Sequence, residues 1–170
     1  MSHYRWMEER LFEVMGTWTT AVPEAAVKRY LATQCHRHSW HASLWQERLP
    51  VLSGVTVDDP MLVPDASLIT FIEALASPVG PDTTIEKLAG ACRVLLPRLV
   101  AAYQAHLVST DQLVDGPTHR VLTLALRDEQ EGWQEGELLL QSLIHTAPEA
   151  ARAAVHQARL EGILVTGAWS

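Results

Sequence analysis

The sequence lacks the patterns that build sheets, membrane spans and nucleic-acid surfaces. Strand-type alternation of apolar and polar residues is absent along the chain, and no apolar run reaches the roughly 18 residues that a membrane span needs. Lys and Arg number 13 against 20 Asp and Glu, the net charge is -7, and the basic residues do not cluster. Phosphate binding requires clustered basic residues, so we expect no nucleic-acid or membrane partner.

Cysteine is also scarce, and the start of the chain carries no targeting pattern. Cys35 and Cys92 have no metal-type spacing and fall inside expected helices, where they suit small buried apolar positions. The first ten residues are charged from the outset and lack the apolar centre of a signal peptide. These features predict a cytoplasmic protein.

What the chain does have is helical periodicity over most of its 170 residues. Apolar residues make up 48 % and charged residues 19 %, which is typical of a globular chain that buries a core of its own. Apolar positions recur at spacings of three and four within 3–19, 23–49, 66–76, 83–107, 115–144 and 146–161. We therefore predict a single all-α domain of residues 1–170, with a bundle core over 3–144 and a terminal helix over 146–161. The long connection 51–65 is expected to cross from one end of the bundle to the other.

Several local features refine the expected helices. Thr83 with Glu86, and Thr146 with Glu149, have the spacing of capping boxes, in which each side chain satisfies a free amide near the other. Pro97 lies inside the third long helix and is expected to kink it there. Gly132 and Gly136 weaken the fourth long helix, which suggests that another helix approaches closely or that space is left for a ligand.

Four ionisable residues fall on helix faces that should turn toward the core. His38 and His41 continue the apolar stripe of the second helix, Glu8 lies beside that of the first, and Glu129 lies within that of the fourth. Buried charges need partners, because an unpaired charge in a core costs several kcal/mol. We expect Glu8 and Glu129 to pair with His38 and His41 across the bundle and to form the catalytic site.

Tyr103 and His106 are polar residues on the inward face of the third long helix. Together with the aromatic walls that Trp45 and Trp133 would provide, they are the expected substrate-binding residues of a small-molecule pocket.

The expected architecture resembles that of ferritin-like bundles, which often have one long crossover. The residues Asp115-Gly116-Pro117-Thr118, followed by Asp128-Glu129, resemble the last bundle helix of bacterial ferritin-like proteins. The segment with Arg37, Trp40 and His41, followed by Arg48-Leu49-Pro50, resembles their second helix. The resemblance covers residues 3–144 and implies a ferritin-like four-helix bundle with an extra C-terminal helix.

The chain departs from that family at its dinuclear metal site. Such a site takes one Glu from each of two helices and a Glu-x-x-His pair from each of the other two. None of the eight histidines has a Glu three residues before it, and Gly132 stands where the fourth helix should place a ligand histidine. We therefore expect a degenerate dinuclear site.

Three functions fit this set of residues. The preferred one is a cofactor-independent enzyme that acts on a small organic molecule, with the pair His38 and His41 as acid or base and the pair Glu8 and Glu129 as partners. The second is a non-catalytic binding module or one half of a homodimer. The third is a mononuclear oxygenase or oxidase, in which the same four residues bind a single iron or manganese ion.

Overall fold

The computed structural model describes residues 1–49 and 66–165, and every regular element in these ranges is helical. The predicted crossover 51–65 lies outside the described residues. The helices are α1 Ser2–Ala21, α2 Ala25–Gln46, α3 Ala66–Ala76, α4 Thr84–Ala89, α5 Leu96–Ser109, α6 Gly116–Leu143 and α7 Ala147–Val165, with a 3-10 turn Pro81–Thr83 (η2) and a π-helical segment Gly90–Leu95 (η3). The prediction of an all-α chain is confirmed.

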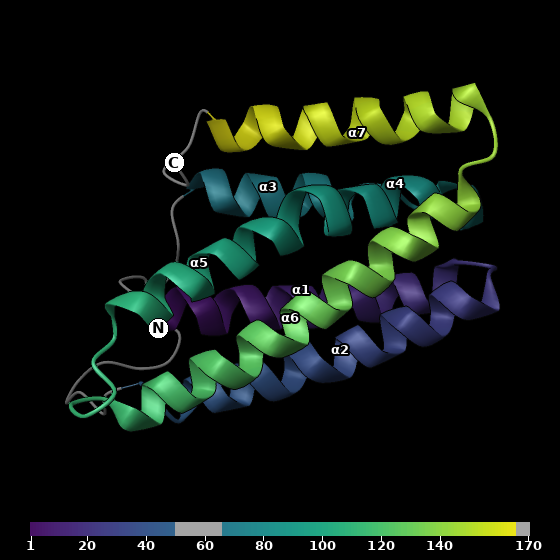
Figure 1. Cartoon of the computed structure of the whole chain (residues 1–170). Helices are drawn as coiled ribbons and strands as arrows, with labels where there is room; N and C mark the ends of the chain where they lie inside the picture. The colour runs from purple at the N-terminus through teal and green to yellow at the C-terminus, as the bar shows by residue number, and fades with distance from the viewer. Residues whose placement is uncertain (50–65, 166–170) are drawn as a thin grey trace.

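Two helical hairpins make the part of the fold that matters for function. The pair α1 and α2 pack along each other, as do α5 and α6, and α2 also packs against α6. Helix α7 lies along α3 and α4, on the side of the molecule away from α2 (Figure 1). The core between the hairpins is apolar over most of its length, with Leu11, Leu31, Leu99 and Leu122 all fully buried.

One of the two capping boxes forms and the other does not. At the start of α7, Glu149 accepts hydrogen bonds from the backbone amides of His145 and Thr146, each at 2.9 Å, and the Thr146 hydroxyl accepts one from the Glu149 amide. Thr83 makes no side-chain cap. Its hydroxyl instead accepts a hydrogen bond of 2.6 Å from the buried ammonium of Lys87, so the prediction for this pair was wrong.

The third long helix changes its winding before Pro97. Residues 90–95 form a π-helical turn, and regular α-helix resumes at Leu96. Proline offers no amide hydrogen to the preceding turn, and an inserted π-turn is one way in which a helix accommodates this loss. The irregularity thus precedes the position at which we expected a kink. Within the π-helical turn, the carbonyl oxygen of Val94 accepts a hydrogen bond of 2.9 Å from the side chain of Arg98.

Gly132 and Gly136 allow side chains of α2 to lie directly on α6. A Cβ at Gly132 would stand 2.5 Å from the amide oxygen of Gln34. A Cβ at Gly136 would overlap both the Tyr30 hydroxyl and the Cys92 sulfur. The two glycines are one turn apart on α6, as Tyr30 and Gln34 are on α2, so they fix the antiparallel alignment of these helices.

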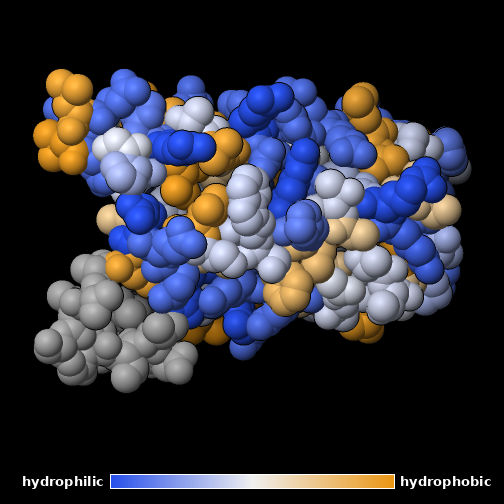
Figure 2. Space-filling view, turned by 90° about the horizontal axis from the view of Figure 1, so that it is seen from below, coloured by the Kyte–Doolittle hydropathy of each residue, from blue (hydrophilic) through white to orange (hydrophobic). Residues whose placement is uncertain are grey.

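Polar residues predominate on the face of the molecule that Figure 2 shows, and the hydrophobic residues on this face form small separate groups. Of the described tryptophans, Trp18 and Trp45 are buried and Trp40 is 43 % exposed. Within the described residues, no helix combines the length and the apolar character required to cross a bilayer.

Gly136→Ala should destabilise the protein by about 1–3 kcal/mol, because the added methyl group overlaps two fully buried side chains on two different elements. The free energy of unfolding, measured by urea titration, checks this.

Gly162→Ala is the matched control, since an added Cβ there meets nothing within 4 Å and the residue lies in helix α7. It should leave stability unchanged or raise it by up to about 1 kcal/mol through helix propensity. Equal destabilisation by the two substitutions would show that the α2–α6 contact does not require glycine.

Candidate functional site

Four ionisable side chains meet in the middle of the bundle. Glu8 comes from α1, His38 and His41 from adjacent turns of α2, and Glu129 from α6; each is no more than 1 % exposed. Their positions continue the inward stripes of three helices, so the apolar residues on either side bury them when the helices pack. We call this group of four residues the His/Glu cluster.

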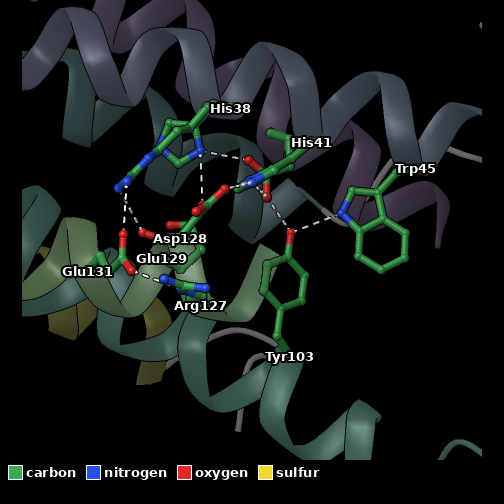
Figure 3. Close-up of polar contacts among 10 residues, drawn as sticks. His38, His41, Trp45, Tyr103, Arg127, Asp128, Glu129 and Glu131 are labelled. Carbon is green, nitrogen blue, oxygen red and sulfur yellow. Dashed lines mark hydrogen bonds and ion pairs between the residues drawn. The ribbon is translucent and has the colours of Figure 1, made fainter. Parts of the chain in front are cut away.

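The two histidines direct their Nδ1 atoms at the two carboxylates (Figure 3). His38 Nδ1 lies 2.6 Å from Glu8 Oε2 and 3.4 Å from Glu129 Oε1. His41 Nδ1 lies 3.2 Å from Glu129 Oε1 and 3.5 Å from Glu8 Oε1. One potential ligand atom from each of the four residues can be chosen so that all lie within 4.8 Å of one another.

A chain of hydrogen bonds from α2 and α5 holds Glu8 in place. The Tyr103 hydroxyl donates to Glu8 Oε1, and the indole of Trp45 donates to the Tyr103 oxygen at 3.1 Å. All three side chains are completely buried. The aromatic pair therefore fixes the orientation of the carboxylate.

His41 is held from its other side by an acid at the edge of the seam. Its Nε2 lies 3.1 Å from Asp128 Oδ2, and the Asp128 side chain is 22 % exposed. Outside this contact, Arg37 of α2 donates hydrogen bonds to two residues of α6, the Asp128 carbonyl at 3.2 Å and the Glu131 carboxylate at 3.0 Å. Arg127 also pairs with Glu131 (Figure 3). These polar contacts cover the seam between α2 and α6 beside His41, where Asp128 is partly exposed.

The cluster strongly perturbs the pKa values of its members. Burial acts to raise the pKa of Glu8, but the charge and hydrogen bond of His38, reinforced by those of His41, outweigh it and lower that pKa to about 2. Burial acts to lower the pKa of His41, but the close contacts and charges of the Glu129 and Glu8 carboxylates raise it to about 10. Against the same burial, the charges of Glu129 and Glu8 raise the pKa of His38. Both imidazoles are thus stabilised as cations in this arrangement.

The structure brings together the four residues expected at the catalytic site, and it places Tyr103 and Trp45 next to them. His106 lies outside the cluster, where its ring packs 5.6 Å from that of Tyr4. Trp133 is half-buried on α6 and packs against the apolar core. Neither of these two expected substrate-binding residues contacts the cluster through a described interaction.

Sequence reasoning missed two residues near the cluster. Asp128 is one of them, and its position immediately before Glu129 places it at the edge of the seam. Gln34 is the other, fully buried on α2 one turn before His38. The spacing of four between Gln34 and His38 was the available signal.

Three hollows in the described surface are lined by other residues. One of about 480 Å³ lies between α1 and α3, one of about 500 Å³ between α1 and α2, and one of about 520 Å³ around Tyr4 and His106. No member of the His/Glu cluster lines any of the three. Of the four expected substrate-binding residues, His106 lines the third hollow, and the prediction of a small-molecule pocket at the cluster stays a prediction.

The stability of the metal-free protein should fall as the pH rises from about 6.5 toward about 10. The folded state keeps His41 protonated in this window while the unfolded state loses the proton, so folding is coupled to proton uptake. The loss is up to about 1.4 kcal/mol per pH unit for each shifted histidine. On the acid side, the contribution of Glu8 should disappear between about pH 4.5 and 2. Thermal unfolding in the presence of a chelator measures both limbs.

His41→Gln should remove the part of the alkaline limb that His41 contributes and leave only the part that His38 contributes. His36→Gln, a change on the exposed face of the same helix, should retain the whole limb. An alkaline limb of unchanged size in His41→Gln would show that His41 does not bind the proton in the folded state.

Comparisons of the chain with protein-family models, with curated proteins and with solved structures found no match. The chemistry of the His/Glu cluster is therefore drawn from its own geometry: two buried imidazoles and two buried carboxylates that converge on one point, with an outer group of Tyr103, Trp45 and Asp128 that orients them.

Proposed function

We propose that the protein binds one divalent transition-metal ion, iron(II) or manganese(II), through Glu8, His38, His41 and Glu129, and that it acts as a mononuclear metal oxidase or oxygenase. The observation that carries the proposal is the convergence of four buried ligand atoms within 4.8 Å of one another. Two imidazoles with carboxylates are a donor set that suits these metals.

The separations within the cluster suit a shared ion. Three of the four nitrogen–oxygen distances lie between 3.2 and 3.5 Å, at or beyond the upper end of the hydrogen-bond range. Neighbouring ligands about 2.1 Å from a common ion stand about 3.0 Å apart in an octahedral arrangement and about 3.4 Å apart in a tetrahedral one, given typical metal–nitrogen and metal–oxygen distances. The fourth contact, His38 with Glu8 at 2.6 Å, is a hydrogen bond that a bound ion would replace.

The hydrogen bonds of the protein leave part of the cluster unsatisfied. Neither carboxylate oxygen of Glu129 has a hydrogen-bond partner, nor does Nδ1 of His41, although both groups are buried. A buried ion pair contributes little stability compared with well-packed apolar residues of similar volume, so stability alone does not account for four charged groups here. A cation at their centre would satisfy the unpartnered atoms at once.

The residues around the cluster have the roles that metal sites require. Tyr103 and Trp45 orient Glu8, and Asp128 accepts from His41 Nε2, which leaves His41 Nδ1 directed at the centre. The surrounding apolar side chains exclude bulk water. When bound, an iron or manganese ion supplies Lewis-acid and one-electron redox chemistry toward a small molecule.

The resemblance to ferritin-like bundles, a fold that we propose for this chain, favours one ion rather than two. Glu8 and Glu129 match ligands of a dinuclear centre, His41 stands where the second helix would supply a glutamate, and Tyr103 stands on the helix that would supply a further carboxylate. Gly132 stands where the fourth helix would place a ligand histidine, and the Gln34 amide occupies the space next to it. The donors that remain are enough for one ion.

Acid–base catalysis on a small organic molecule, without a metal, is the second candidate. The observation that favours it is the contact between His41 Nε2 and the partly exposed Asp128, which offers a proton a route between the core and solvent. Under this alternative His38 and His41 exchange protons with the substrate, and Glu8 and Glu129 orient them.

The purified protein should bind one iron(II) or manganese(II) ion per chain. Glu129→Gln and the double variant His38→Ala/His41→Ala should lose the ion, because each removes ligands from the centre. Metal content by mass spectrometry after equilibration with each ion, including zinc(II), provides the measurement.

Glu135→Gln and His36→Ala change exposed residues of α6 and α2 and should keep the full stoichiometry. Absence of bound metal in the wild type under all conditions would reject the metal centre and leave acid–base catalysis as the function to test. Equal binding by the ligand and control variants would place the ion elsewhere.

Metal affinity should increase as the pH rises from about 6.5 to 9, up to about tenfold per pH unit for each proton displaced. The raised pKa values of His38 and His41 mean that the ion competes with protons on both imidazoles. Isothermal titration in buffers of different ionisation enthalpy should report the release of one to two protons per ion at neutral pH. Binding without proton release would contradict coordination by these nitrogens.

A further inference from the structure

A column of buried polar side chains extends along α2 beyond the His/Glu cluster. Tyr30, Gln34, His38 and His41 follow one another at spacings of four, four and three, and all are buried. Tyr30 contacts the Cys92 sulfur at 3.6 Å, and both histidines contact carboxylates. Gln34 differs from the other three, because neither its amide oxygen nor its amide nitrogen has a hydrogen-bond partner.

An unpartnered buried amide is costly. Leaving a buried polar group unsatisfied costs about 1–3 kcal/mol, and an apolar side chain of similar length would fill the same volume without that cost. Packing against Gly132 therefore explains the size of the Gln34 side chain but not its amide. The amide requires a partner that the protein itself does not supply.

Other unpartnered atoms lie within one helical turn of Gln34. His38 Nε2 is one of them, on the next turn of α2, where residues four apart share a face. Oε2 of Glu129 is another, three residues before Gly132 on the facing helix α6, where Oε1 of the same carboxylate faces the two histidines. These atoms belong to adjoining turns of two packed helices, so a ligand bound at Gln34 would adjoin the cluster.

We propose that the Gln34 amide, seated on Gly132, binds a small exogenous anion that occupies a free coordination position of the metal ion. This inference rests on the proposed metal centre and names the ligand class that the centre accepts. Four protein donors leave one or two positions open on an iron(II) or manganese(II) ion of five or six ligands. The amide nitrogen donates a hydrogen bond to the anion, whereas a larger molecule would displace Gln34 from Gly132.

The test is the binding of azide to the full chain loaded with cobalt(II), followed by the visible absorption of the metal. Gln34→Leu keeps the apolar volume and removes the amide, and Gln34→Met is a second apolar variant of greater length in case the first does not fold. Each should bind one cobalt ion and should bind azide at least tenfold more weakly than the wild type, which is the effect of one lost hydrogen bond.

Gln141→Leu is the control, because Gln141 is exposed on α6. This variant should bind azide as tightly as the wild type. Gly132→Ala should also weaken azide binding, because the added methyl group displaces the Gln34 amide. Cobalt binding with unchanged azide affinity in the apolar Gln34 variants would overturn this inference alone, and so would a wild-type cobalt protein that binds no azide. A wild type that binds no metal would overturn the proposed function and this inference together.

Discussion

The burial of two carboxylates opposite two imidazoles is the constraint on which the centre of this bundle depends. A glutamate that is fully buried among leucines must be neutral or must meet a cation, and Glu8 meets His38 at 2.6 Å. This contact requires α1 and α2 to keep one alignment, while the contacts of Glu129 require the same of α6. Apolar packing alone would tolerate small shifts between these helices, whereas the ionic contacts do not. The cluster therefore sets the relative positions of three helices.

The glycines of α6 act with the cluster to set this alignment. Because Gly132 accommodates Gln34 and Gly136 accommodates Tyr30, the two helices meet at successive turns in one antiparallel register. A shift of one turn would place the Gln34 or Tyr30 side chain against a residue that has a Cβ. The same register brings His38 and His41 to Glu129. The fold thus uses both shape and charge to place the four ionisable side chains within a few ångströms of one another.

The sequence revealed the features that depend on spacing within one helix, and it did not reveal those that depend on contacts between helices. A period of three and four identifies the inward face of a helix, and this was enough to find the helices and to bring Glu8, His38, His41 and Glu129 together. Asp128 could not be found in the same way, because it lies next to the inward stripe and its contact depends on the distance between two helices. Thr83 has a capping spacing, but the ammonium of Lys87 takes its hydroxyl, which is a competition that spacing does not express. Pro97 predicts an irregularity but not its form, so the proline alone located the π-turn only approximately.

The formal charges of the His/Glu cluster allow the same arrangement of side chains in the metal-free protein and with the proposed metal ion. With both imidazoles protonated, two positive charges face two carboxylates, and the group is neutral as a whole. With both imidazoles neutral, the proposed divalent cation would supply the same two charges at the same place. The core therefore never holds a large net charge, which would be expensive in a medium of low dielectric constant. Protons would thus substitute for the proposed ion in the metal-free protein, and this charge balance allows the buried cluster to remain folded without the ion.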